Sequence, residues 1–170
     1  LEICMVGKEH VIILNKYPVE IGHLLLITKK WAPQDGWLSI NDFNALVSVE
    51  DDTNGLWFFN SGIKAGASQP HRHIQLLRRV EKERLCPNQK LLESLIYASK
   101  NEVFLKNSIS ISKRYREHSD MKGVVLHQIY IELCKKMQIG NPMQDEKPIK
   151  PYNLLISEEW IALIRRKKEH

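Results

Sequence analysis

The alternation of side chains in the stretch HRHIQL constrains the fold most strongly. Three polar side chains, those of His71, His73 and Gln75, alternate there with a second set that includes Ile74 and Leu76. Successive side chains of a β-strand point to opposite faces of the sheet. The pattern therefore predicts a strand that presents two imidazoles and an amide on one face and apolar residues on the other.

Further β-branched and apolar runs, separated by turn residues, predict more strands. The predicted strands are residues 10–14, 23–28, 56–59, 71–80, 152–157 and 159–167. Amphipathic stretches predict helices at residues 39–49, after Pro87 and at residues 124–137, the first with Ser39 as N-cap and acidic Asp42 in its first turn. We expect a loop over residues 104–122 and a linker over residues 140–151. This order predicts an α+β fold, a mostly antiparallel sheet with flanking helices, in a single domain of residues 1–170.

The apolar runs, the cysteines and the net charge exclude some classes of protein. The longest apolar runs are too short or too polar to span a bilayer. Residues 1–6 have neither a basic region nor a cleavage pattern, so we expect no signal peptide in them. The cysteines, Cys4, Cys86 and Cys134, are widely spaced, which predicts free thiols in a reducing cytoplasm. The net charge of +5 favours ligands that carry phosphate, but no basic and aromatic stripe typical of nucleic-acid binding accompanies it.

The loop before the predicted histidine strand is suited to anion binding. Gly62 and Gly66 allow unusual dihedral angles and a close approach of the backbone to a ligand. Successive backbone N–H groups in such a loop can form a concave anion site. The loop also carries polar side chains that can bind phosphate: Ser61, Lys64, Ser68 and Gln69.

An imidazole beside a phosphate site is a good nucleophile toward phosphorus, because it is neutral near pH 7 and its phosphoramidate is labile. Gln75 neither takes nor gives a proton at neutral pH, but its amide can hold a phosphoryl oxygen. We therefore expect a long-lived covalent intermediate that reacts with an acceptor. Gln75 should give little help in activating water. Two alternatives stay open: a metal-binding pair of histidines, for which no third ligand stands at a recognisable spacing, and two strand histidines without a role.

The stretch NSGIKAGASQPHRHIQ, residues 60–75, resembles the signature of the ATP adenylyltransferase family, also called diadenosine tetraphosphate phosphorylases. This family is in the transferase branch of the histidine triad superfamily, whose hydrolase branch has a histidine where this chain has Gln75. The similarity extends over residues 10–80 and residues 148–170. The resemblance implies a histidine-triad-like sheet and cleavage of diadenosine tetraphosphate by inorganic phosphate to ATP and ADP.

The resemblance also implies roles for individual residues. His73 is expected to be the nucleophile that becomes adenylylated, with His71 and Gln75 orienting and binding phosphate. The substrate is expected to contact Asn15, Lys16, Asn60, Ser61, Gly62, Gly66, Ala67, Ser68 and Gln69. His23 stands where the superfamily often has a further histidine, and it is either a site residue or a strand-end residue. The remaining histidines are expected to be surface or structural residues: His10, His118, His127 and His170.

No tightly bound cofactor or metal site is expected, since Mg²⁺ can chelate the polyphosphate without a protein ligand. The expected partners are nucleotide substrates and inorganic phosphate, without nucleic acid or membrane, for a monomer or homodimer. The family usually has a longer chain, so we expect this one to be a short variant or to lack family segments at its ends. Three competing functions stay open: a histidine-triad hydrolase, a non-catalytic nucleotide-binding module and a sugar-1-phosphate uridylyltransferase.

Overall fold

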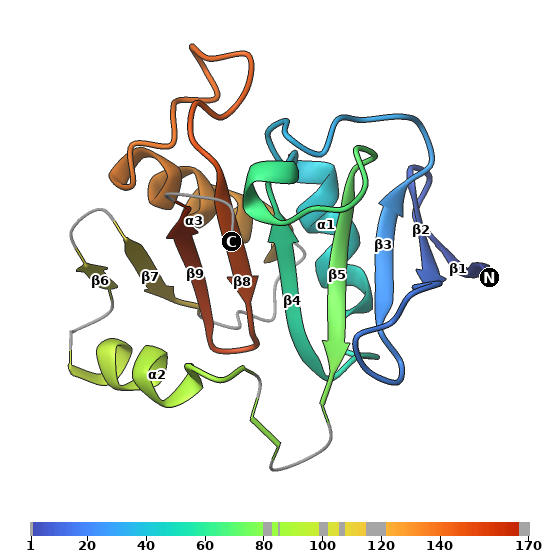
Figure 1. The fold of residues 1–170 in the computed structure, drawn as a ribbon, viewed down its shortest axis with the longest axis horizontal. Coiled ribbons are helices and arrows are strands. Elements are labelled where there is room, and N and C mark those ends of the chain that lie inside the picture. The colour runs from blue at the N-terminus through green and yellow to red at the C-terminus, as the bar shows by residue number, and fades with distance from the viewer. Residues whose placement is uncertain are drawn as a thin grey trace.

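The strands pair into one antiparallel sheet of nine strands, in the order β1-β2-β3-β5-β4-β8-β9-β7-β6 (Figure 1). The structure is a computed structural model that describes residues 2–79, 83–84, 86–98, 102–105, 108–114 and 122–166. The strands are β1 (Glu2–Val6), β2 (His10–Leu14), β3 (Leu24–Thr28), β4 (Gly55–Asn60), β5 (His73–Arg78), β6 (Glu102–Leu105), β7 (Ile109–Lys113), β8 (Tyr152–Ile156) and β9 (Trp160–Arg165). The helices are α1 (Ile40–Glu50), the short 3-10 helix η1 (Ile63–Ala65), α2 (Gln89–Ala98) and α3 (Lys122–Lys136).

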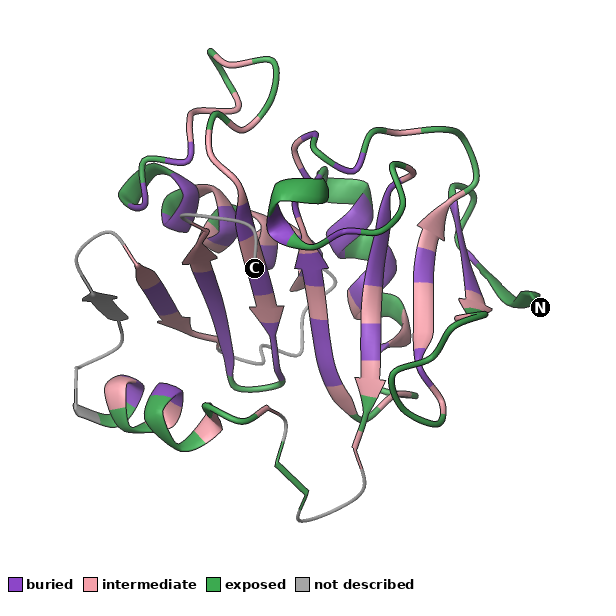
Figure 2. Ribbon diagram, in the orientation of Figure 1, coloured by how far each residue is buried: buried purple, intermediate pink, exposed green. Residues whose placement is uncertain are grey.

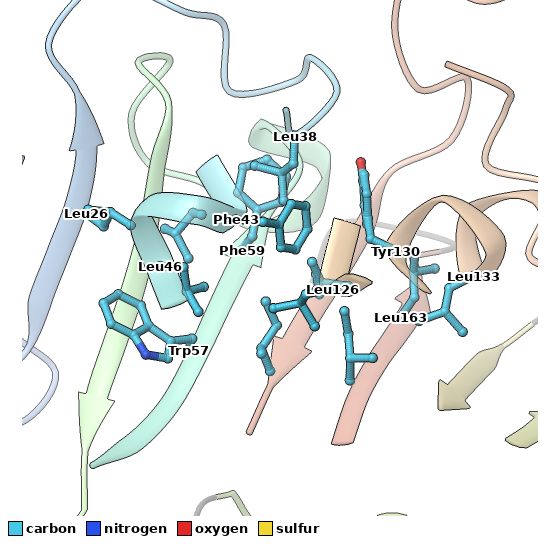
Figure 3. Packing of buried hydrophobic residues seen from close by; sticks show 14 of the residues in the cluster. Leu26, Leu38, Phe43, Leu46, Trp57, Phe59, Leu126, Tyr130, Leu133 and Leu163 are labelled. Atoms are coloured by element: carbon cyan, nitrogen blue, oxygen red, sulfur yellow. The ribbon is translucent and has the colours of Figure 1, made fainter. Parts of the chain in front are cut away.

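Helices α1 and α3 cover one face of the sheet and form the main core with it. Ile74 and Leu76 of β5 point to this face, and Trp57 and Phe59 of β4 do the same. Figure 3 shows these β4 side chains packed among residues of both helices, such as Phe43. The alternation predicted for the histidine strand is therefore confirmed, since its apolar side chains lie in the core.

The part of the chain that the structure describes covers the opposite face only in part. Helix α2 packs Leu92 and Ile96 against Trp160, Ile111 and other residues near one end of the sheet. Figure 2 shows bands of buried and half-buried residues along β4 and β5. The buried ones include Trp57 and Ile74, which lie in the core with α1 and α3. The polar face of β5 thus lies on the open side.

Helix α1 begins after Ser39, the predicted N-cap, and a capping box forms there. The Ser39 hydroxyl accepts a hydrogen bond from the backbone N–H of Asp42, and the Asp42 carboxylate accepts one from the backbone N–H of Ser39. This reciprocal pair satisfies N–H groups that a helix leaves unpaired at its start. It also fixes the position of a buried carboxylate under the histidine strand.

The expectation of a loop over residues 104–122 is wrong in its first part. Strands β6 and β7 pair there, and β7 continues the sheet beside β9. The sequence Ile109–Lys113 alternates apolar and polar residues, which is typical of a half-buried strand, but the polar and mixed composition of residues 104–122 favoured a loop. Pairing with β9 places this short alternation in the sheet. Residues 115–121 lie outside the described residues.

The other predicted elements agree with the structure to within a few residues. The linker at residues 140–151 has neither helix nor strand, and the Trp37 indole donates a hydrogen bond to the carbonyl of Asp145 within it at 2.9 Å. None of the helices in the described ranges has an apolar stretch long enough to cross a membrane.

Helix α3 approaches α1 closely at Gly123, and this contact yields a stability prediction. A Cβ atom at Gly123 would lie 2.1 Å from Oδ1 of Asn44 and 2.9 Å from its backbone N and Cα. We expect Gly123→Ala to lower the free energy of unfolding by about 1–3 kcal/mol, because backbone atoms must move apart. Denaturant unfolding measures this, with exposed Gln128→Ala on the same helix as control. A Gly123→Ala variant as stable as that control would contradict the contact.

Candidate active site

Strand register places two rows of side chains on the open face of the sheet. In the first row Leu25 pairs with Gln75, Gln75 with Phe58, and Phe58 with Leu155. Directly paired residues of antiparallel strands point to the same side of the sheet. All four are half-buried, so the row is an apolar surface with one amide in it.

The second row is polar and lies one step closer to the loop of residues 60–70. It contains His73, which pairs with Ile27 of β3, and Asn60, which pairs with Asn153 of β8. Figure 1 shows this loop, with η1, crossing in front of the ends of β4 and β5. The two rows therefore form an apolar platform beside a polar strip, which suits a ligand with a flat ring and phosphates.

The hydrogen bonds of His73 determine which of its nitrogens can react. Nδ1 lies 2.7 Å from the carbonyl oxygen of His71, and a carbonyl oxygen only accepts, so Nδ1 carries the proton. The unprotonated Nε2 of the neutral ring then keeps its lone pair. Burial lowers the pKa of His73, the hydrogen bond to His71 opposes this shift, and the charges of His71 and His23 add to it. The ring is therefore neutral near pH 7, with a lone pair on Nε2.

A chain of hydrogen bonds orients Gln75. The Nδ2 amino group of Asn15 and the backbone N–H of Val19 both donate to Nδ1 of His23, at 3.2 and 3.4 Å. Nε2 of His23 must then carry the proton, and it donates to Oε1 of Gln75 at 3.0 Å. The Gln75 carboxamide is fixed in this way, and its amino group has no hydrogen-bond partner among the residues that the structure describes. Burial lowers the pKa of His23, which keeps this tautomer neutral.

His71 precedes the strand rather than lying within it. It forms an isolated bridge with Pro33, and its Nε2 lies 3.0 Å from Oγ1 of Thr28 and 3.3 Å from the carbonyl oxygen of Lys30. The Trp31 indole contacts the ring edge-on, with centroids 5.6 Å apart. His71 is thus fixed at the end of β3, while His73 and Gln75 lie within β5.

The loop of residues 60–70 folds as the glycines predicted, with positive φ angles of 83° at Gly62 and 96° at Gly66. Asn153 donates to Oδ1 of Asn60 at 2.6 Å and to the carbonyl oxygen of Ala65 at 2.8 Å. The Asn60 amino group reaches the carbonyl oxygen of Gly66 at 3.4 Å. Strand β8 therefore holds the predicted substrate residue Asn60 and the loop together.

The remaining predicted substrate residues differ in their environment. The Ser61 hydroxyl is buried and accepts a hydrogen bond from the backbone N–H of Tyr152, so it braces the loop. Ala67 is buried, whereas Ser68 and Gln69 are exposed. Lys16 is exposed, with Nζ 5.5 Å from the centre of the Tyr17 ring.

A groove of about 570 Å³ runs along the outer side of this loop. It is lined by Ser61, Gly62 and Gln69, and by lysines from two segments, Lys64 from the loop and Lys147 and Lys150 from the linker. Within the described part of the chain, no three histidine, cysteine or carboxylate side chains gather closely enough to hold a metal ion.

A buried ionic cluster lies under the histidine strand. Arg72 donates from Nη1 to Asp42 at 3.1 Å and from Nη2 to the carbonyl oxygen of Pro33 at 2.9 Å. Nε2 of His10 donates to the same carboxylate at 2.9 Å. Burial raises the pKa of Asp42, but the hydrogen bond from His10, the charge of Arg72 and the bonds from Ser39 outweigh it and lower the pKa.

Sequence reasoning missed several residues of this arrangement. Gln34 binds the backbone of His73, and Asn153 binds the side chain of Asn60. Asp42 was predicted only as part of the start of a helix, and its contact with Arg72 was missed. His10 and His127 are structural, as expected, because one binds Asp42 and the other packs on Phe43. His118 and His170 lie outside the described residues.

The fold is shared with known nucleotide-handling proteins. The crystal structure of yeast Ap4A phosphorylase Apa2 in complex with AMP aligns with a TM-score of 0.73 at 24% identity, over 95% of this chain and 58% of that one. A uridylyltransferase structure aligns with a TM-score of 0.56 at 14% identity, over 96% of this chain and 76% of that one. The class is therefore the α+β fold that these structures share.

The sequence comparisons identify the family within this class. Residues 1–94 match the model of the Ap4A phosphorylase N-terminal domain, and residues 101–170 match that of the ATP adenylyltransferase C-terminal domain. The chain therefore belongs to the diadenosine tetraphosphate (Ap4A) phosphorylase family, as its resemblance implied.

Two relatives come from Saccharomyces cerevisiae. Protein APA1 is 28% identical over 95% of this chain, and diadenosine tetraphosphate phosphorylase 2 is 27% identical over 93% of it. The alignments cover 56% and 55% of those proteins, so the chain spans about half the length of these relatives.

The lowered pKa of His73 predicts its titration. Because burial disfavours the imidazolium, we expect His73 to titrate below the ordinary histidine value of about 6.5 and to stay neutral at pH 7. Any reaction that uses its lone pair then declines only as the pH falls through this lowered value. The Cε1–H chemical shift, assigned with a His73→Asn variant, measures the titration by NMR. A midpoint at or above 6.5 would contradict the described environment.

The ionic cluster predicts a large effect of a small change at Asp42. We expect Asp42→Asn to lower the free energy of unfolding by about 3–5 kcal/mol, because the buried Arg72 guanidinium loses its counter-charge. Denaturant unfolding at pH 7 measures the loss. Asp35→Asn, at an exposed ion pair with Lys147, is the control and should change stability by less than about 1 kcal/mol. Equal effects of the two substitutions would rule out the structural role of the cluster.

Proposed function

We propose that this chain carries the catalytic machinery of a nucleotidyltransferase that cleaves diadenosine tetraphosphate with inorganic phosphate to ATP and ADP. The observation that carries the proposal is Nε2 of His73, which keeps its lone pair and has no hydrogen-bond partner among the described residues, while Nδ1–H binds the carbonyl of His71. Membership of the Ap4A phosphorylase family and the yeast relatives' names support the choice of substrate.

In the first step Nε2 of His73 attacks the phosphorus next to one adenosine. The N–P bond forms, the P–O bond to the neighbouring phosphate breaks, and ATP leaves. The adduct carries a positive charge on the ring, and the Nδ1–H bond to the His71 carbonyl stabilises that charge. Gln75, oriented by His23, donates a hydrogen bond from its amino group to an oxygen of the transferred phosphoryl group.

In the second step an oxygen of inorganic phosphate attacks the same phosphorus. The P–N bond breaks, ADP leaves, the neutral ring of His73 is restored, and the proton of the attacking phosphate passes to solvent. Gln75 cannot act as a general base toward water, which leaves the intermediate to phosphate. His71, Asn60 and the loop residues Gly62, Gly66, Ala67, Ser68 and Gln69 bind the phosphates, with Asn15 and Lys16 near the nucleotide.

The proposed setting is the cytoplasm, where the free thiols of Cys4, Cys86 and Cys134 stay reduced. The protein needs no resident metal or cofactor in this scheme, because Mg²⁺ can enter with the polyphosphate. It works as a monomer or a homodimer. The chain spans about half the length of its relatives, so the assay uses this chain itself.

The test is incubation with diadenosine tetraphosphate, with and without inorganic phosphate, followed by ion-exchange chromatography of the nucleotides. The proposal predicts ATP and ADP with phosphate and, without it, only ATP stoichiometric with the protein. Release of ATP and AMP regardless of phosphate would mean hydrolysis. Binding of the dinucleotide without any product would identify a non-catalytic module.

Gln75→His tests the discrimination against water. An imidazole at this position can take a proton from water, so we expect the phosphate-independent rate of AMP release to rise about tenfold or more. His73→Asn is the matched control and should release nothing. An unchanged rate of AMP release in Gln75→His would show that the amide does not protect the intermediate.

A further inference from the structure

The ladder between β4 and β5 stops beside the nucleophile. Its last pair is Phe58 with Gln75, although continued register would bring Asn60 opposite His73. In an antiparallel sheet those two residues would exchange N–H···O bonds directly. Instead, a side chain from a different segment lies between them.

That side chain is Gln34, which is 2% exposed. Its Oε1 accepts a hydrogen bond from the backbone N–H of His73 at 2.8 Å. Its Nε2 donates to the carbonyl oxygen of Asn60 at 2.8 Å and to that of His73 at 3.2 Å. One carboxamide thus satisfies both backbone polar groups of His73 on this side and ties them to the end of β4.

Gln34 is itself held by the backbone. Its N–H donates to the carbonyl oxygen of Pro70 at 2.8 Å, and the N–H of Arg72 donates to the carbonyl oxygen of Ala32 at 2.8 Å. Residues 32–34 therefore run beside residues 70–72 like a short strand. The Gln34 side chain therefore reaches His73 from a backbone segment that is itself fixed. Both the donor and the acceptor of its carboxamide form hydrogen bonds.

We infer that Gln34 is a positioning residue for His73: it replaces the missing β4–β5 pair and fixes the peptide from which the nucleophilic ring projects. Nε2 can react only if the His73 ring points in a defined direction. The ring belongs to a residue whose backbone N–H and carbonyl both bind Gln34. The expected effect on adenylyl transfer rests on the proposed function, whereas the effect on the His73 backbone does not.

The first test compares Gln34→Leu with the wild type. Leucine has a similar size but neither donor nor acceptor, so the buried N–H of His73 loses its partner. We expect the single-turnover rate of His73 adenylylation by diadenosine tetraphosphate to fall about 100-fold, since small displacements of reacting groups have effects of this size. The dissociation constant of the dinucleotide should change by no more than about threefold, because Gln34 acts on the reactive step.

Two controls separate positioning from loss of stability. Gln128→Leu, at an exposed position on α3, should leave the rate unchanged. Gly123→Ala disturbs the contact with Asn44 on the other side of the sheet. Its adenylylation rate shows how far the rate falls when only the stability of the fold is lowered. A Gln34→Leu rate equal to that of Gly123→Ala would overturn the inference.

Gln34→Glu gives a pH signature that a purely structural role would not give. Ionised glutamate accepts from the His73 N–H but faces the carbonyl oxygens of Asn60 and His73 without a donor, while protonated glutamate restores a donor. The ratio of its adenylylation rate to the wild-type rate should therefore rise as the pH is lowered. A ratio independent of pH would contradict the inference.

Amide exchange gives a readout independent of activity. The His73 backbone N–H should be protected from exchange in the wild type and should exchange at least tenfold faster in Gln34→Leu. In Gly123→Ala this amide should still exchange only through global unfolding. If the wild type forms no adenylyl intermediate, the proposed function fails and this exchange alone decides the role of Gln34. Equal protection of His73 in the wild type and Gln34→Leu would overturn it.

Discussion

The hydrogen bond between Nδ1 of His73 and the carbonyl oxygen of His71 determines what this sheet can do chemically. It assigns the proton to one ring nitrogen and leaves the other with a lone pair at the open face. The bond exists because His71 lies just before the strand, where it pairs with Pro33, so its carbonyl can meet the ring two residues later. Burial then keeps the imidazole neutral, and the Gln34 carboxamide binds the backbone N–H and carbonyl of the same residue.

The open face is assembled from both halves of the chain. His73, Gln75 and Phe58 come from the part that matches the N-terminal family model, and Asn153 and Leu155 come from the part that matches the C-terminal one. The pairing of β4 with β8 joins these parts into one sheet. The two family models therefore describe one continuous structure in this chain, and the polar strip depends on both.

The sequence predicted the features that local patterns encode. Alternation identified the histidine strand, and Ser39 with Asp42 identified the start of α1, because strand faces and helix caps depend on neighbouring residues. The roles of Gln34 and Asn153 arise only when distant segments meet, so no spacing in the sequence could show them. The β6–β7 pair was missed because the short alternation at Ile109–Lys113 lies in a polar and mixed segment, and its pairing with β9 arises only in the fold.

The most direct test of the account is to locate the adenylyl group. The protein is incubated with diadenosine tetraphosphate without phosphate, digested, and the modified peptide is identified by tandem mass spectrometry, while ³¹P NMR of the intact protein distinguishes the two ring nitrogens. The account predicts one adenylyl group on Nε2 of His73. A group on Nδ1, on His71 or on His23, or none at all in protein that binds the dinucleotide, would contradict it.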